Sequence, residues 1–334
     1  MAGNQDISCR SAFSVTSSAL VTGAYGFVGV RLCKLLVERD WRVVAGHRGR
    51  ASPADLPGVT SAYLPLSSEP DRWHHSLQSI DCVVHLAAQV HQMRHGRAED
   101  AAYEEINVGG SRFVAEQAAG AGVKRFILLS SAKVNGEGSN ARSYRAEDPT
   151  EPRDAYARSK LAAETIIREI CGRTGMEFVI VRPPLVYGPG VRANFHRLLG
   201  LAERGWPLPL GSIANRRSLV GVGNLADFIA TCMTHPQAAG RVWMVTDGED
   251  VSTPDLIRRA ARLMRRPARL FPCPPAILKM LANLIGRGAE AARLCDSFVL
   301  NAAPARDILR WKPPMSIDEE LERTVADYLA RRKG

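Results

Sequence analysis

Long hydrophobic runs, paired cysteines and aromatic residues are all scarce in this chain of 334 residues. The apolar stretch from Ala276 to Ile285 contains Lys279 and Asn283 and is far shorter than the about 18 residues of a membrane-spanning helix. The seven cysteines are scattered without a Cys-x-x-Cys pair, so we expect neither a disulfide framework nor a metal site, and we expect reduced thiols. Because the region before the first predicted strand lacks the basic start of a signal peptide, we expect a cytoplasmic protein.

Acidic residues are fewer than basic ones, with 34 Asp and Glu against 44 Lys and Arg, so the net charge is +10. A positive balance favours an anionic partner, such as a nucleotide, a phosphate or an acidic lipid. Aromatic residues make up 6% of the chain and do not interleave with the basic ones, so we expect no nucleic-acid binding. The hydrophobic fraction of 46% and the charged fraction of 23% are typical of a globular protein.

Short runs rich in Val, Ile and Leu alternate with segments of helical periodicity. Continuous apolar strands that alternate with amphipathic helices are typical of a parallel sheet covered on both faces. We therefore predict an α/β protein with a doubly wound, Rossmann-type parallel sheet. The predicted strands are 18–22, 41–46, 80–86, 125–130 and 178–182, and the clearest helices are 27–39, 101–119 and 154–173.

The pattern becomes less regular after Arg182, where prolines break the chain into loops and short helices. We expect a dinucleotide-binding Rossmann domain over residues 18–182, to which residues 217–246 return. Residues 183–216 and 247–330 are expected to form a smaller, substrate-binding domain. Residues 1–17 are expected to be a polar N-terminal tail.

Three glycines follow the first predicted strand directly, in the run LVTGAYGFVG, and the next helix begins at Phe27. A dinucleotide site needs one glycine for a tight turn, one for close approach of the pyrophosphate and one for packing of helix on strand. Gly23, Gly26 and Gly29 have this spacing in this context, so they predict dinucleotide binding. The alternative interpretation is a glycine-rich turn without a ligand.

The end of the second predicted strand indicates which dinucleotide is bound. An acidic residue there bonds the ribose 2′-hydroxyl of NAD, whereas a cation favours the 2′-phosphate of NADP. This sequence reads VVAGHRGR, so His47 and Arg48 stand where an Asp is expected, and Arg50 follows. We therefore favour NADP(H), with Arg48 as the main phosphate contact, and keep NAD(H) and a solvated basic loop as alternatives.

A tyrosine and a lysine four residues apart lie in the helix predicted over 154–173, in the run YARSK. This spacing puts Tyr156 and Lys160 on one face of the helix, a turn apart. An ammonium group about 6 Å away lowers the pKa of a phenol by about two, which predicts a general base or acid. Ser130 and Ser131 end a buried strand, at the sheet edge where ligands bind, so a hydroxyl there is expected to bond the reacting oxygen.

These features stand in one order with HLAA at 85–88, NVGGS at 107–111, SSAKVNG and RPPLVYGPG. Together they resemble the extended short-chain dehydrogenases/reductases, in the NAD-dependent epimerase/dehydratase family. The nearest likeness is to bacterial UDP-sugar 4-epimerases and UDP-4-keto-6-deoxy-sugar 4-reductases of surface-polysaccharide synthesis, and it covers nearly the whole chain.

The resemblance implies roles for individual residues. Ser131, Tyr156 and Lys160 would be the catalytic triad, and Lys160 would also hold the nicotinamide ribose. The cofactor would be bound by Gly23, Gly26, Phe27, Gly29, His47, Arg48, Leu86, Ala87, Ala88, Asn107, Tyr156, Lys160 and Pro183. The UDP-sugar substrate would be bound by Ser131, Lys133, Asn194, Phe195 and Arg217, with the arginine on the diphosphate.

The chain departs from the family pattern at several positions. Leu185 replaces a usual Asn, and Pro65 replaces an Asp that often touches adenine. Ala132 and Lys133 follow Ser131 where 4,6-dehydratases carry an Asp-Glu pair. Because no other acid and base are evident to eliminate water, we do not expect dehydratase activity.

Three functions from two classes remain open. We favour a UDP-4-keto-6-deoxy-HexNAc 4-reductase, because the basic end of the second strand favours NADPH and because SSAKVNGE resembles the 4-ketoreductases. The alternative is a UDP-glucose or UDP-GlcNAc 4-epimerase, which keeps NAD bound through its cycle. A non-catalytic dinucleotide-binding protein is the third.

Each remaining feature has a purely structural and a functional interpretation. The arginines at 258, 262, 265 and 269 are expected to be a solvated face, with peripheral contact to anionic lipid as the alternative. The stretch from Ala276 to Ile285 is expected to pack in the smaller domain or over the substrate, with a dimer or membrane-surface contact as the alternative. Homodimers are common in the superfamily that this sequence resembles. His85, His91 and His95 have no carboxylate cluster that would complete a metal site.

Overall fold

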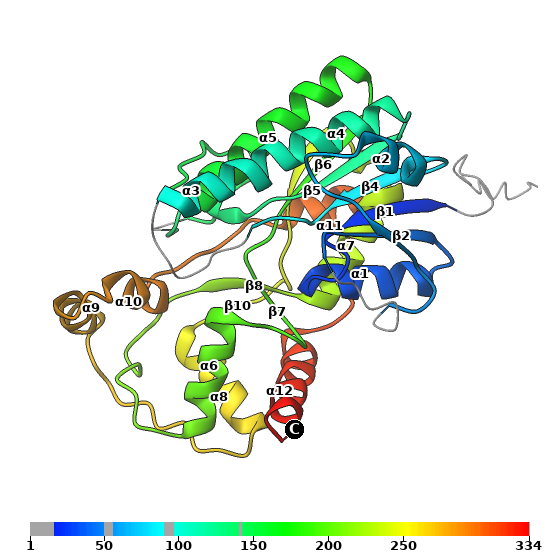
Figure 1. Ribbon diagram of the computed structural model, residues 1–334. Coiled ribbons are helices and arrows are strands. Elements are labelled where there is room, and N and C mark those ends of the chain that lie inside the picture. The colour runs from blue at the N-terminus through cyan, green and yellow to red at the C-terminus, as the bar shows by residue number, and fades with distance from the viewer. Residues whose placement is uncertain (1–16, 50–55, 90–96, 140–141, 334) are drawn as a thin grey trace, which may run out of the picture.

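The computed structural model describes residues 17–49, 56–89, 97–139 and 142–333. Arg50, His91, His95 and residues 1–16 of the expected tail lie outside these ranges. A seven-stranded sheet forms the centre of the molecule, with strand order β3-β2-β1-β4-β5-β6-β9 (Figure 1). All its strand pairs are parallel. Its strands are β1 (Ser18–Thr22), β2 (Arg42–His47), β3 (Thr60–Tyr63), β4 (Cys82–His85), β5 (Arg125–Leu129), β6 (Glu177–Arg182) and β9 (Arg241–Met244).

Alternate residues of the strands feed two separate cores, one on each face of this sheet. Within β1, Ala19 and Val21 belong to one hydrophobic cluster and Leu20 to the other. One face is covered by α1 (Phe27–Glu38), α7 (Val222–Thr234) and α11 (Ala303–Leu309), and the other by α2 (Pro70–Leu77), α4 (Gly110–Gly120) and α5 (Ala155–Thr174) (Figure 1). The predicted doubly wound Rossmann fold is therefore confirmed.

The helix predicted over 101–119 contains a change of helical type. Regular helix α3 (Arg97–Tyr103) passes into a π-helical turn (Glu104–Gly109), and α4 follows without a break. Such π turns insert one extra residue and are frequent at functional sites. Here the turn carries Asn107, which is almost fully buried at 1% exposure.

A second, three-stranded sheet of order β10-β8-β7 lies beside the large one (Figure 1). Its strands are β7 (Leu185–Tyr187), β8 (Arg217–Gly221) and β10 (Asp250–Val251). Of the segment 217–246, β9 pairs with β6 in the large sheet, whereas β8 pairs with β7 in the small one. The small sheet packs with three helices around a third hydrophobic cluster: α6 (Ala193–Arg204), α8 (Thr253–Leu263) and α12 (Ile317–Lys333).

Two further helices, α9 (Pro275–Leu284) and α10 (Gly288–Cys295), pack on one another at the edge of the molecule (Figure 1). The stretch Ala276 to Ile285 packs in the smaller domain only in part, because Leu278 contacts the third hydrophobic cluster but α9 has no buried residue. No helix in the described ranges is both long and apolar enough to cross a membrane.

Candidate active site

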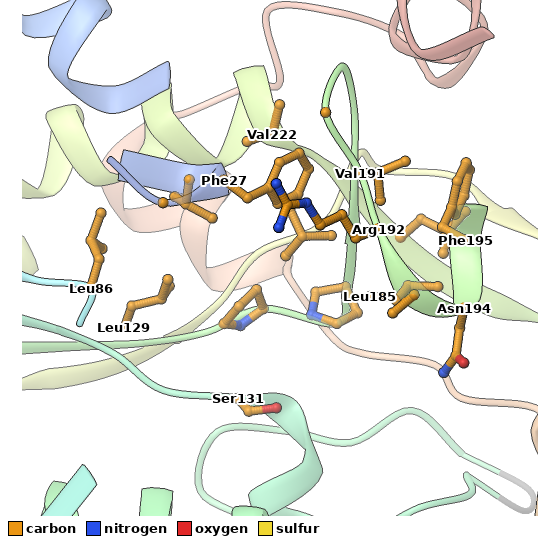
Figure 2. A pocket seen from close by; sticks show the side chains of 18 of the residues that line it. Phe27, Leu86, Leu129, Ser131, Leu185, Val191, Arg192, Asn194, Phe195 and Val222 are labelled. Carbon is orange, nitrogen blue, oxygen red and sulfur yellow. The ribbon is translucent and has the colours of Figure 1, made fainter. Parts of the chain in front are cut away.

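A cleft of about 1380 Å³ opens at the carboxyl edge of the large sheet, between it and the small sheet. Figure 2 shows Ser131 on one wall, with Phe27 and Val222 facing it from the opposite side. Nearly all the residues predicted for the cofactor and the substrate line this one cleft. The exceptions are Lys160 and Asn107, which lie behind its wall.

The glycine-rich turn has the geometry that a dinucleotide requires. Gly23 has a left-handed φ of +68°, and a Cβ atom on it would lie 2.9 Å from the backbone nitrogen of Ala87. A Cβ atom on Gly29 would lie 2.2 Å from the Gly23 carbonyl oxygen, so neither position has room for a side chain. No side chain caps the N-terminus of α1 at Gly26, and the first turn of α1 lines the cleft. These residues fit a bound pyrophosphate at a helix N-terminus.

The end of β2 is basic and aromatic where it meets the cleft. The ring of His47 lies between those of Tyr25 and Tyr63, with centroids 5.7 and 6.0 Å away. Arg48 is exposed and lines the cleft beside it. The charged side chain at the end of β2 that faces the cleft is therefore a cation and not a carboxylate.

A buried histidine orders the loop after β4, which carries Leu86, Ala87 and Ala88 along the cleft. Ser111 donates its hydroxyl proton to the Asn107 carbonyl (2.6 Å), so it must accept from His85 Nε2 (3.1 Å). His85 Nδ1 therefore accepts from the hydroxyl of Thr22 (2.8 Å), and Thr22 Oγ1 accepts from the Ala87 N–H (3.2 Å). Burial lowers the pKa of His85 to about 3. This histidine is a neutral structural link between β1, β4 and α4.

Asn107 does not touch the cleft, in contrast to its expected cofactor contact. Its side chain bonds the backbone N–H and carbonyl of Gln89 at 2.7 and 3.1 Å and donates to Ser159 Oγ at 2.9 Å. Ser159 in turn donates to the Tyr156 carbonyl at 2.8 Å. The π-helical turn therefore positions both the loop after β4 and the helix that carries the tyrosine.

The tyrosine, lysine and serine of the predicted triad come from α5 and from the end of β5. Asp154 caps α5 by accepting from the Ala157 N–H at 2.7 Å, which fixes the start of the helix just before Tyr156. Tyr156 lines the cleft, and its phenol is hydrogen-bonded with Ser131. Lys160 lies one turn further along α5 and is 3% exposed.

The electrostatics of this group differ from the prediction made from spacing alone. Burial, reinforced by the charge of Asp154, raises the pKa of Tyr156 to about 12, although the Ser131 hydrogen bond opposes the rise. Burial also lowers the pKa of Lys160 to about 8, partly offset by Glu164. The predicted lowering of the tyrosine pKa by the lysine is therefore wrong for the chain alone, because desolvation of the phenol is the larger effect. The tyrosine holds its proton.

An ion pair that no motif indicated lies directly behind the triad. Arg182, at the end of β6, donates from Nε and Nη2 to both carboxylate oxygens of Glu164 at 2.9 and 2.6 Å, and both side chains are at most 3% exposed. Ser130 donates to the same carboxylate at 2.5 Å. The pair thus ties the end of β5 to α5, and with it Ser131 to the helix of Tyr156 and Lys160.

The predicted substrate residues line the other end of the cleft, with differing availability. Asn194 is exposed at the start of α6, whereas the ring of Phe195 is buried and stacks on Tyr187 with centroids 5.1 Å apart. Arg217 lines the cleft and donates to the carbonyls of Arg293 (2.7 Å) and Asp296 (3.0 Å). Pro183 follows β6 and also lines the cleft.

Lys133 is less available than predicted for a substrate contact. Its ammonium group is paired with Asp154 and lies 3.2 Å from Glu137.

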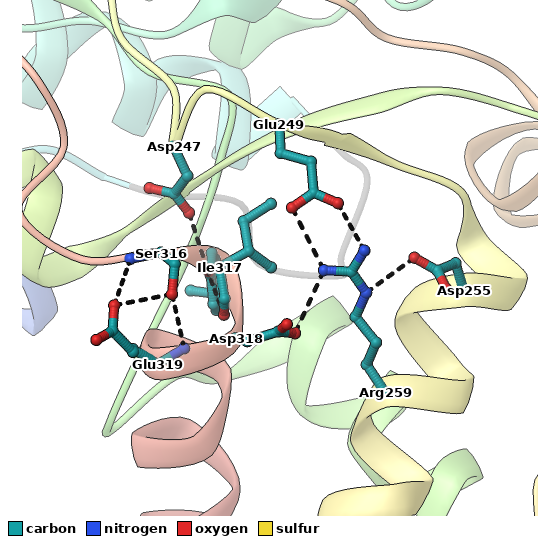
Figure 3. Close-up of polar contacts among 9 residues, drawn as sticks. Asp247, Glu249, Asp255, Arg259, Ser316, Ile317, Asp318 and Glu319 are labelled. Carbon is teal, nitrogen blue, oxygen red and sulfur yellow. Dashed lines mark hydrogen bonds and ion pairs between the residues drawn. The ribbon is translucent and has the colours of Figure 1, made fainter.

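The cleft wall formed by α8 is held in place by Arg259. Its guanidinium donates to Glu249 and Asp255 at 2.6 and 2.9 Å and bridges to Asp318 of α12 (Figure 3).

The sequence also matches a known family. The model of the NAD dependent epimerase/dehydratase family matches residues 19–245. The chain belongs to this family. The likeness inferred from the motifs is confirmed, and the protein is an enzyme of the short-chain dehydrogenase/reductase type. The family depends on NAD, in agreement with the glycine-rich turn.

Individual members of the family are similar over nearly the whole chain. A UDP-glucose 4-epimerase of Vibrio cholerae is 38% identical, covering 96% of this chain and 98% of the relative. An N-acetyl-alpha-D-glucosaminyl-diphospho-ditrans,octacis-undecaprenol 4-epimerase of Escherichia coli O157:H7 is 26% identical, covering 93% and 95%. The structure of a UDP-glucuronic acid 4-epimerase from Bacillus cereus with NAD has a TM-score of 0.76 at 20% identity, covering 94% and 99%, which shows the shared fold.

Proposed function

We propose that the enzyme transfers a hydride at carbon 4 of a UDP-hexose, acting as a UDP-4-keto-6-deoxy-HexNAc 4-reductase in surface-polysaccharide synthesis. The observation that carries the reductive direction is the basic end of β2, where His47 and Arg48 meet the cleft at the position of the expected carboxylate. A reductase exchanges its cofactor in every turnover and draws on NADPH. The undecaprenol-linked sugar named for the Escherichia coli relative supports the link to polysaccharide synthesis.

The protonated tyrosine also supports the reductive direction. Reduction of a 4-keto group needs a proton for the new hydroxyl oxygen, and the raised pKa of Tyr156 keeps that proton on the phenol at neutral pH. Ser131, bonded to the same phenol, would orient the keto oxygen, and Lys160 would hold the ribose from behind the wall. When bound, the dinucleotide supplies the hydride.

The opposite wall of the cleft would hold the rest of the substrate. Arg217, with its Nη1 held by two carbonyls, would present its remaining donors to the diphosphate. Asn194 at the start of α6 would contact the uridine end of the substrate. Phe195, stacked on Tyr187, would act through its main chain or by fixing the position of α6.

A 4-epimerase is the second candidate. The 38% identity to a UDP-glucose 4-epimerase extends through the small sheet and its helices, where the sugar would be bound. An epimerase would use Tyr156 first as a base and then as an acid, and it would need the positive charge of an oxidised nicotinamide to lower the raised pKa of the phenol.

Two incubations separate these candidates. With a UDP-4-keto-6-deoxy-HexNAc and NADPH, we expect stoichiometric oxidation of NADPH. The loss of NADPH absorbance measures this oxidation. With UDP-GlcNAc or UDP-glucose alone, we expect no new sugar in a nucleotide-sugar separation. Conversion of either sugar without oxidation of NADPH would reverse the choice.

Arg48 gives a separate prediction about the cofactor. If Arg48 binds the 2′-phosphate, Arg48→Ala should weaken NADPH about tenfold or more, the cost of losing a hydrogen bond to a charged group, and leave NADH nearly unchanged. Fluorescence titration with both reduced cofactors measures this. Arg112→Ala, which removes an exposed arginine of α4 far from the cleft, is the control. Equal weakening of both cofactors would contradict a phosphate contact.

A further inference from the structure

Helix α9 exposes its apolar side. Ile277, Met280, Leu281 and Leu284 follow one another at helical spacing of three and four residues, and with Ile285 they form what we call the α9 stripe. Their exposed fractions lie between 45 and 77%. Leu278, at the border of this stripe, packs against the core of α6, α8 and α12. A surface helix normally buries such a stripe, so this one is arranged to meet something outside the chain.

The charge around the α9 stripe indicates what it meets. Residues 265–296, which include α9 and α10 and the segment before them, contain six Lys and Arg and two Asp and Glu, a net charge of +4. Arg265, Arg266 and Arg269 are exposed just before α9, and in the described part of the chain none of them has an ion-pair partner. Arg287 lies three residues after the end of α9, 3.9 Å from Glu290, and its side chain is 71% exposed.

Apolar side chains at the centre of a basic segment fit an anionic bilayer. A helix at a bilayer surface inserts its apolar face while neighbouring Lys and Arg contact acidic headgroups. A second copy of this chain fits the stripe less well, because a symmetric contact would bring two segments of charge +4 together. We infer that the α9–α10 pair docks the enzyme on a membrane surface that carries anionic phospholipids.

Docking at this place also orients the cleft. Glu290, Arg293 and Leu294 of α10 line the cleft that contains Tyr156. Because α9 and α10 pack on one another, a bilayer under α9 lies beside the substrate end of the cleft and away from the glycine-rich turn. The enzyme would exchange its substrate next to the headgroups.

Flotation of the full chain with lipid vesicles tests the inference. With equal parts of phosphatidylcholine and phosphatidylglycerol at an ionic strength of about 0.01 M, we expect most of the protein to float, and less at about 0.15 M, where screening is stronger. Vesicles of phosphatidylcholine alone should bind little of the protein. No flotation with the anionic vesicles at either ionic strength would overturn the inference.

Variants on the exposed face separate specific docking from general charge attraction. Leu281→Gln with Leu284→Gln should lower partitioning at least about tenfold, because both side chains lose their insertion into the bilayer. Arg266→Glu with Arg269→Glu should lower it on anionic vesicles. Arg112→Glu on α4 changes the net charge elsewhere and should leave most of the binding. Equal loss in all three variants, or a dimer that the leucine variant converts to monomer, would contradict membrane docking.

Discussion

Replacing Tyr156 by Phe should reduce turnover by about 10²–10⁴-fold, the usual contribution of a general acid or base, and leave cofactor binding nearly unchanged. The phenol lines the cleft, is hydrogen-bonded with Ser131 and keeps its proton because burial raises its pKa. The substituted ring retains the edge-on packing against Tyr103, with centroids 6.0 Å apart, so the fold should persist. Initial rates and a titration with reduced cofactor measure the two effects separately.

Tyr25→Phe is the matched control, since it removes a hydroxyl from the same cleft, in the turn after β1 beside His47. That hydroxyl donates to Ser61 at 3.1 Å, away from the triad. Its loss should change the rate by no more than a few-fold, as expected for one exposed neutral hydrogen bond. A Tyr156→Phe enzyme that retains most of its activity would remove the phenol from the mechanism. A variant without cofactor binding would instead show that the phenol shapes the dinucleotide site.

The second large effect is expected on stability. Glu164→Ala leaves the guanidinium of Arg182 buried without its carboxylate, which should lower the free energy of unfolding by about 3–5 kcal/mol. It also removes the acceptor of the Ser130 hydroxyl. Urea unfolding followed by circular dichroism measures the change.

Two further variants make this result specific. Glu169→Ala removes an exposed carboxylate from the same helix and should change stability by less than about 0.5 kcal/mol. The double variant Glu164→Leu with Arg182→Met removes both charges and should be more stable than Glu164→Ala, because no buried charge is left unpaired. If Glu164→Ala and Glu169→Ala unfold at the same urea concentration, the buried pair does not support the fold as described.

The elements that carry the motifs could be predicted because their signals are local. Buried parallel strands are apolar throughout, so β1, β4, β5 and β6 were found within two residues of their bounds. Strand β3 was missed because it lies at the sheet edge, largely exposed, with the sequence TSAY. The π-helical turn at Asn107 was missed because the chain is helical on both sides of it and one extra residue does not interrupt the helix.

What the sequence could not indicate depends on burial and on contacts between distant residues. Glu164 and Arg182 are 18 positions apart on different elements, and no pattern pairs them. The spacing of Tyr156 and Lys160 gives their proximity on the helix but not the desolvation that decides the direction of the pKa shift. The periodicity of α9 shows which residues share a face but not that this face remains uncovered.

The buried link at His85 makes the cofactor side of the protein sensitive to acid. An ordinary histidine takes up a proton near pH 6.5, but the pKa of His85 is lowered to about 3, because its ring is desolvated and the charges of Lys160 and Arg48 oppose a further positive charge. Between pH 6.5 and about pH 3, His85 is protonated in the unfolded chain but neutral in the native chain. The free energy of unfolding that this histidine contributes above pH 6.5 is therefore progressively lost as the pH falls. Mild acidification therefore lowers the stability of the native chain through this buried histidine without titrating the triad.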